Sequence, residues 1–142
     1  MLPTLSASTV LTRAGVDRDR LRKVMPRVDP QRVRVGPAPR LIRLVWPQRI
    51  SAVTMPWAIY IRPSLWEAFS TAVSPARAGS LMVHELMHVE QLLRYGVVRH
   101  GLRYVTDYLR GRIRGLGHWD AYREIPFEQE ARAAARMVVG IR

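Results

Sequence analysis

The chain has 142 residues with a formal net charge of +12, and 48% of its residues are hydrophobic. This length suits a single domain with a real core, and the apolar content excludes an intrinsically disordered chain. No cysteine is present, which excludes disulfides and thiolate metal ligands.

The apolar segments of the sequence are too short to cross a membrane. The nearest one, residues 41–61, is interrupted by arginines and prolines, whereas a membrane-spanning helix needs about 18 or more apolar residues. Residues 1–15 lack a basic segment followed by a continuous apolar block, so no signal peptide is expected. Together with the lack of cysteine, these features favour a cytoplasmic location without membrane insertion.

The N-terminal part is predicted to contain a helix followed by a linker. Residues 8–25 have helical character, and Pro26 can end that helix. Residues 28–40 are rich in proline and glycine and are interpreted as a linker with a short strand at 32–35.

The main part of the chain is expected to begin with strands. Residues 41–46 fit either a helix or a strand, and two short segments rich in β-branched and aromatic residues, 51–54 and 57–61, are predicted strands. We therefore divide the chain into an N-terminal part, residues 1–40, and a main part, residues 41–142. The two parts are expected to form one compact unit.

The rest of the chain is predicted to be mainly helical. Ser74 and Pro75 are typical of a helix start and Gly96 of a helix end, so one helix is expected over 75–95. The other predicted elements are a short helix at 63–69, a helix at 98–110, a glycine-rich loop at 111–117 and a last helix at 126–139. The fold class that follows is α+β, mainly helical, with a small β-sheet.

The central helix carries the string His84-Glu85-Leu86-Met87-His88, which has the H-E-x-x-H pattern. Residues four apart lie on the same face of a helix, so both imidazoles can bind one ion. Glu85 is rotated by about 100° from His84, which suits a general base better than a ligand. Two histidine ligands beside a carboxylate are what zinc-assisted hydrolysis needs. The motif therefore predicts a Zn²⁺ site with Glu85 as the catalytic residue.

A catalytic zinc ion normally takes a third protein ligand. A histidine six residues after His88 is excluded, because that position is Arg94. We favour Glu128, which lies in the first turn of the last helix and can face the motif helix, with Glu130 and Glu124 as the main alternatives. The full set of candidates downstream of the motif is His100, His118, Asp107, Asp120, Glu124, Glu128 and Glu130.

Other polar side chains are candidates for contacts with a substrate. Gln91 lies three residues after His88 on the ligand side of the helix, where it can orient a ligand or touch substrate. Stabilising a developing oxyanion requires a further hydrogen-bond donor. The candidates for this donor are Tyr95, Tyr104, Tyr108, Tyr122 and His118.

Several strings together resemble a known family. Residues 84–91, the strand segments 52–54 and 59–61, and residues 126–131 resemble the short bacterial zincin-like metallopeptidases of the gluzincin type. The resemblance extends over roughly residues 50–136. It implies a zincin-like fold for the main part of the chain, with the motif on a central helix, and a peptidase activity.

The resemblance also implies roles for individual residues. In gluzincins the third ligand is a downstream glutamate often followed three residues later by alanine, a spacing that Glu128 and Ala131 match. The chain departs from the pattern at Arg132, where these enzymes often carry an acid. Family likeness further implies an edge strand beside the cleft, for which the strand at 57–61 is the candidate. The expected substrate-binding residues are therefore Trp57, Ile59 and Tyr60, in addition to Gln91.

These observations predict a zinc-dependent metallopeptidase that acts on a peptide or protein. Glu85 would take a proton from a metal-activated water and deliver it to the leaving amine. The alternative is a non-proteolytic zincin-fold binding module, with nucleic acid held by the basic surface, or another metal-dependent hydrolase. Nucleic acid is the less favoured partner, since the arginines are spread along the chain.

Overall fold

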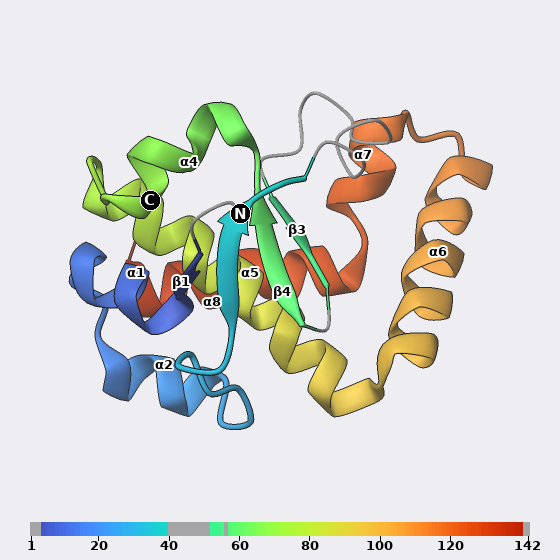
Figure 1. Cartoon of the computed structure of the whole chain (residues 1–142). Coiled ribbons are helices and arrows are strands. Elements are labelled where there is room, and N and C mark those ends of the chain that lie inside the picture. Colours follow the sequence, from blue (N-terminus) through green and yellow to red (C-terminus); the bar gives the residue numbers. More distant parts are fainter. Residues whose placement is uncertain (1–3, 40–51, 56, 141–142) are drawn as a thin grey trace.

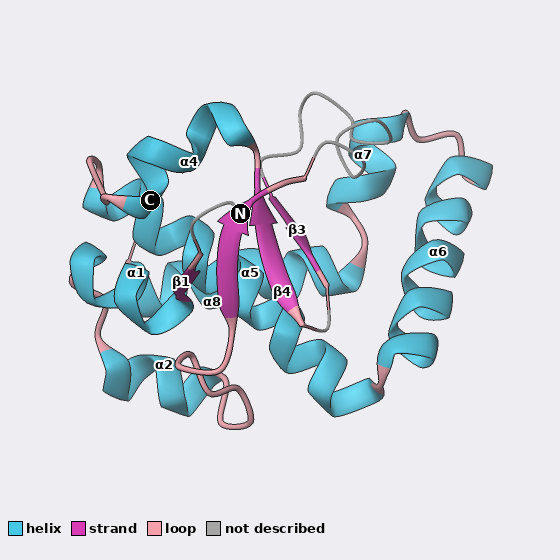
Figure 2. Cartoon of the chain, in the orientation of Figure 1, coloured by secondary structure: helices cyan, strands magenta, loops and turns pink. Residues whose placement is uncertain are grey.

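The computed structural model of the chain contains one small sheet with helices packed around it (Figure 1). It describes residues 4–39, 52–55 and 57–140. The longest helix and the last helix cross behind the sheet in the view of Figure 2, and the remaining helices lie at both sides. The predicted α+β class with a small sheet is confirmed. The expectations for residues 41–46 and Ser51 lie outside the described residues.

The four described strands form one mixed sheet. They are β1 (Leu5–Ser6), β2 (Arg34–Pro37), β3 (Ala52–Thr54) and β4 (Ala58–Ile61), in the order β1-β2-β4-β3. β2 pairs in parallel with β4, whereas β1 pairs with β2 and β3 pairs with β4 in antiparallel orientation. Among the described strands, β3 therefore lies at one edge of the sheet and β4 in its interior.

The strand at 57–61 is confirmed as β4, but its expected place at the edge is wrong. Val35 of β2 pairs with Ile59 of β4, which closes the side of β4 that β3 does not cover. Ile59 and Ile61 are two residues apart and therefore lie on the same face of the sheet, where both are fully buried. The strand expected at 32–35 begins two residues later, at Arg34.

The single helix expected over 8–25 is two helices, α1 (Ala7–Ala14) and α2 (Arg18–Val24). Gly15 adopts a left-handed conformation (φ 69°) and ends α1, which a residue with a side chain rarely does without strain. Asp17 then caps α2 by accepting two backbone N–H bonds of its first turn. Gly15 and Asp17 thus break the predicted helix.

The other helical predictions agree closely with the structure. The helices are α4 (Pro63–Ser70), α5 (Pro75–Tyr95), α6 (Val97–Ile113), α7 (His118–Arg123) and α8 (Pro126–Val139). The glycine-rich segment at 111–117 is only partly a loop, because α6 continues to Ile113, and the short helix α7 was not predicted. Of the helices that the structure describes, none has the length and apolarity needed to cross a membrane.

The core joins the N-terminal helices, the sheet and the two long helices behind it. Leu11 of α1, Ile59 of β4 and Leu86 of α5 are fully buried members of one hydrophobic cluster. α8 contributes Ala131 and Ala134 to the same cluster. Such small side chains allow the axes of α5 and α8 to approach closely, and this approach brings the start of α8 to the middle of α5.

A buried carboxylate ties the N-terminal part to α5. Glu90 is fully buried, and its Oε1 accepts the backbone N–H groups of Arg27 at 2.8 Å and Val28 at 3.1 Å. Its Oε2 lies 3.4 Å from Nη1 of Arg27 and 3.7 Å from Nη2 of Arg94. Because a buried charge is tolerated only when it is paired and hydrogen-bonded, these contacts fix the loop after α2 against α5.

We expect Glu90→Ala to lower the free energy of unfolding by about 3–5 kcal/mol, because it leaves Arg94 and two backbone donors without their carboxylate. Urea unfolding followed by circular dichroism measures the loss. The control is Glu124→Ala, which removes an exposed ion pair with Arg114 and should cost less than about 1 kcal/mol. Equal losses in the two variants would contradict a structural role for Glu90.

Candidate metal centre

Three predicted ligands converge where α8 begins beside α5. His84 and His88 lie one turn apart on α5, and Glu128 lies in the first turn of α8. Oε1 of Glu128 is 3.1 Å from Nε2 of His84, and Oε2 of Glu128 is 2.9 Å from Nε2 of His88. One ligand atom from each residue lies within 4.8 Å of the others. These three residues can therefore hold one metal ion.

The chemistry of this donor set fits zinc. Two imidazole nitrogens and one carboxylate oxygen are a common ligand set of catalytic zinc sites, and three protein ligands leave a coordination position open. The side chains are enclosed, with exposed fractions of 19% for His84, 10% for His88 and 3% for Glu128. Enclosed ligands of this kind are held in place by their surroundings, so little ordering is needed on binding.

Charge pairing dominates the electrostatics of these three side chains. Burial disfavours the carboxylate of Glu128, but hydrogen bonds from His84 and His88 outweigh it and hold the pKa of Glu128 well below its usual range. Burial likewise disfavours the imidazolium of His88, but Glu128 outweighs it and raises the pKa of His88 from 6.5 to about 9. Since a metal binds deprotonated imidazole, metal binding must displace the proton on His88.

Two tyrosines complete the surroundings of Glu128. The hydroxyl of Tyr104 donates to Oε2 of Glu128 at 3.0 Å, and that of Tyr122 donates to Oε1 at 2.9 Å. Burial, followed by the charge of Glu128, raises the pKa of both tyrosines above its usual range, so both hydroxyls stay protonated. The other predicted donors lie elsewhere: Tyr108 bonds to His118, and Tyr95 packs on Phe127.

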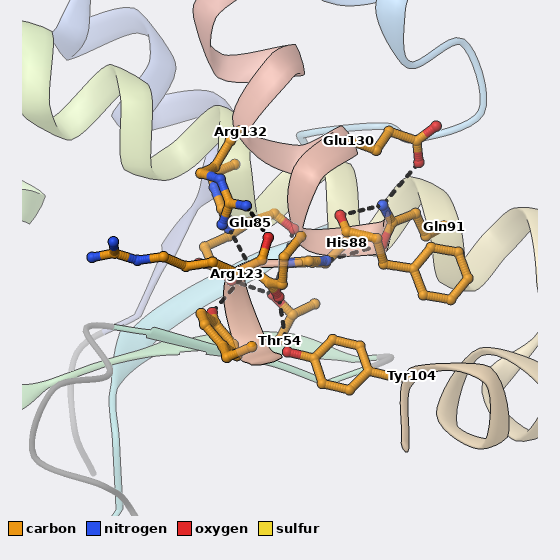
Figure 3. Close-up of polar contacts among 12 residues, drawn as sticks. Thr54, Glu85, His88, Gln91, Tyr104, Arg123, Glu130 and Arg132 are labelled. Atoms are coloured by element: carbon orange, nitrogen blue, oxygen red, sulfur yellow. Dashed lines mark hydrogen bonds and ion pairs between the residues drawn. The ribbon is translucent and has the colours of Figure 1, made fainter. Parts of the chain in front are cut away.

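Glu85 is oriented by the edge strand of the described sheet. The hydroxyl of Thr54 on β3 donates to Oε2 of Glu85 at 2.7 Å (Figure 3). Glu85 is only 6% exposed, yet it contributes to the wall of the cavity at the centre. Its role as a general base, expected from the sequence, stays a prediction. The sequence pattern predicted a strand that contains Thr54, but it assigned no role to this side chain.

Gln91 lies behind the ligands and not in the cavity. It is fully buried, and its side-chain NH₂ group donates to the carbonyl of Phe127 at 3.0 Å and to Oε1 of Glu130 at 2.8 Å (Figure 3). Its oxygen therefore faces Nδ1 of His88 at 2.9 Å and Nε2 of His100 at 3.1 Å. His88 thus carries a proton on Nδ1, which directs Nε2 toward the metal position. Of the two roles expected for Gln91, only the orientation of a ligand agrees with this position.

A cavity of about 310 Å³ opens beside the centre. β3 forms one wall with Ala52, Val53 and Thr54, and α6 forms another with His100 and Tyr104. The residues that line it are Ala52, Val53, Thr54, Glu85, His88, Leu92, His100, Gly101, Tyr104, Val105, Tyr122 and Glu128.

The aromatic residues expected to bind substrate lie away from this cavity. Trp57 is 63% exposed and donates to the hydroxyl of Tyr60 at 2.9 Å, while Ile59 is fully buried in the core. None of these three residues is among the described side chains that line the cavity. The reason is the strand order, since β3 lies between β4 and the cavity side of the sheet.

The alternative third ligands have other partners. Glu130 accepts from Gln91 and lies 3.4 Å from Nη1 of Arg94, and Glu124 pairs with Arg114 at 2.9 Å.

Comparison of the chain with protein-family models, with curated proteins and with solved structures finds no match.

We expect Gln91→Met to lower the affinity of the centre for a divalent metal, with Zn²⁺ as the probe, by about 10–100-fold, because His88 loses the hydrogen bond that orients it. Competition with a fluorescent chelator measures the affinity, and circular dichroism checks that the variant is folded. Gln129→Met is the matched control, since Gln129 is exposed on the same helix as Glu128. A folded Gln91 variant with unchanged affinity would show that the hydrogen bond is dispensable.

The metal-free protein should lose stability as the pH rises from about 6.5 to about 9. The pKa of His88 is higher in the folded chain, at about 9, than its ordinary value of 6.5, so its pairing with Glu128 is fully present below pH 6.5 and is lost as the pH passes through about 9. Urea unfolding in EDTA across this range tests the slope. Glu128→Gln should make the free energy of unfolding less dependent on pH. An equally steep dependence in that variant would exclude the pairing of His88 with Glu128 as its cause.

Proposed function

We propose that this chain is a zinc-dependent metallopeptidase. The observation that carries the proposal is the position of Glu85, a nearly buried carboxylate held by Thr54 in the wall of the cavity that His88 and Glu128 also line. A structural acid would be satisfied by several partners, as Glu90 is. Glu85 instead presents a carboxylate to the space beside a set of zinc-type ligands, as a general base requires.

His84, His88 and Glu128 would hold the zinc ion. When bound there, zinc supplies a Lewis acid that activates water and polarises a carbonyl group at neutral pH. Glu85 accepts the proton of the attacking water and delivers it to the leaving amine nitrogen. The Thr54 hydroxyl donates to Oε2 of Glu85 and would hold the carboxylate in place for both transfers.

Tyr104 and Tyr122 are the residues placed to stabilise negative charge on the substrate. Both hydroxyls lie within hydrogen-bond distance of Glu128, and both line the cavity. Their raised pKa values keep them as donors throughout the physiological range. Each hydroxyl has one proton, which it donates to Glu128, so one of the two would have to turn from Glu128 to the substrate to act as an oxyanion donor.

The edge strand β3 supports a peptide as substrate. Ala52, Val53 and Thr54 line the cavity, and among the described strands β3 pairs with β4 alone. An extended peptide can add to such an edge through main-chain hydrogen bonds. The strand that would pair with a peptide substrate is therefore β3, and not the strand at 57–61 that was expected from the sequence.

Two variants test the metal and the base separately. Glu85→Gln should keep near-stoichiometric zinc but lower the hydrolysis of peptide libraries by about 100-fold or more, whereas Glu128→Gln should lose zinc, as measured by mass spectrometry. The matched control is Glu124→Gln, an exposed acid outside the centre. Hydrolysis that persists in Glu85→Gln would overturn the mechanism, and a wild-type chain that binds no zinc would overturn the proposal.

A further inference from the structure

The outer face of α6 carries an unusual row of exposed aliphatic side chains. Five residues form this row, here called the α6 stripe, with exposed fractions between 51% and 86%. They are Val98, Leu102, Val105, Leu109 and Ile113. In the part of the chain that the structure describes, α6 packs mainly against α5 and α7, and these contacts leave the stripe uncovered.

The spacing of the stripe places it on one side of the helix. Steps of four, three, four and four residues keep side chains on one face of an α-helix. The opposite face contributes Tyr104 to the centre and packs Gly111 against α7, where a Cβ atom would lie only 3.1 Å from that of Ala121. α6 stands at the side of the molecule away from α1 and α2 (Figure 1). The stripe therefore faces outward along roughly 25 Å of helix.

Exposed arginines follow the stripe along one flank. Arg99, Arg103 and Arg110 are all exposed and lie on one face, next to the stripe, where they line a shallow hollow. The one acid of α6, Asp107, is 3.7 Å from Nη1 of Arg110. α6 thus combines an apolar stripe with a positively charged flank, and the whole chain carries a net charge of +12.

We propose that the α6 stripe docks on an anionic phospholipid bilayer, with α6 lying in the plane of the headgroups. A regular amphipathic helix with aliphatic residues on one face and arginines beside them is suited to this position. Anionic headgroups complement Arg99, Arg103 and Arg110. A second copy of the chain would instead bring the same arginines together.

A protein partner is less well matched by the stripe. The centres of protein interfaces are enriched in aromatic side chains, methionine and arginine, whereas this stripe is built only from valine, leucine and isoleucine. Val105 belongs both to the stripe and to the lining of the cavity. Docking would therefore hold the mouth of the cavity close to the bilayer surface. Such docking would not require the proposed peptidase activity.

Co-sedimentation with vesicles tests the proposal. The full chain should bind vesicles of phosphatidylcholine mixed with phosphatidylglycerol much more tightly than vesicles of phosphatidylcholine alone. Replacing Arg99, Arg103 and Arg110 by glutamine should weaken binding by roughly fivefold per arginine. The matched control replaces Arg20, Arg22 and Arg136, three exposed arginines on other helices, by glutamine.

A second pair of variants tests the apolar contribution. Leu102→Ser with Leu109→Ser should weaken vesicle binding by about tenfold or more, whereas Val73→Ser with Met137→Ser, at exposed positions outside α6, should leave it unchanged. Circular dichroism verifies folding, and zinc content measured on the same samples separates membrane binding from the metal centre.

Fluorescence distinguishes insertion from electrostatic adhesion. Because the chain has no cysteine, Thr106→Cys next to the stripe and Gln129→Cys on α8 can each carry one polarity-sensitive fluorophore. Anionic vesicles should shift the emission to the blue at position 106 alone. Equal shifts at both positions, or vesicle binding that is unchanged in the α6 variants, would overturn the proposal. A chain that binds no vesicles but forms a dimer through α6, or binds an acidic protein through α6, would also overturn it.

Discussion

The burial of one carboxylate, that of Glu128, is the constraint on which the rest of the centre depends. A nearly buried negative charge is costly unless it is fully hydrogen-bonded, and four side chains meet this need: His84, His88, Tyr104 and Tyr122. They come from α5, α6 and α7, so three helices have to meet at the first turn of α8. The same contacts therefore determine both how these helices pack and where the ligands lie. A zinc ion at this position would replace a proton as the counter-charge of the same carboxylate.

Behind this centre, the protein uses buried polar side chains to fix helices relative to one another. Gln91 connects His88 on α5 to His100 on α6 and to the backbone of α8 at Phe127. One residue earlier, Glu90 binds the loop that follows α2. Successive residues of one helix point in directions about 100° apart, so these neighbours contact different parts of the structure around α5. The ligands are thus held by regular helices and not by loops, which favours precise geometry.

α6 faces two environments at once. Its inner side provides Tyr104 to the carboxylate and His100 to Gln91, and its outer side exposes the aliphatic stripe and its arginines. Val105 lies between the two sides, at the edge of the cavity. The helix that carries the proposed docking surface is therefore also the helix that provides Tyr104.

Features that depend on local spacing could be read directly from the amino-acid order. His84, Glu85 and His88 share a helix, and the four-residue step fixes their relation whatever the rest of the fold does. The first-turn position of Glu128 also follows from local patterning, which made it the favoured third ligand. The place of Thr54 at the centre does not, because it depends on the pairing of β4 with β2, and pairing between distant segments leaves no periodic signal in either one. The position of Gln91 behind the ligands also depends on the assembled chain, because the residues that bury it come from distant segments.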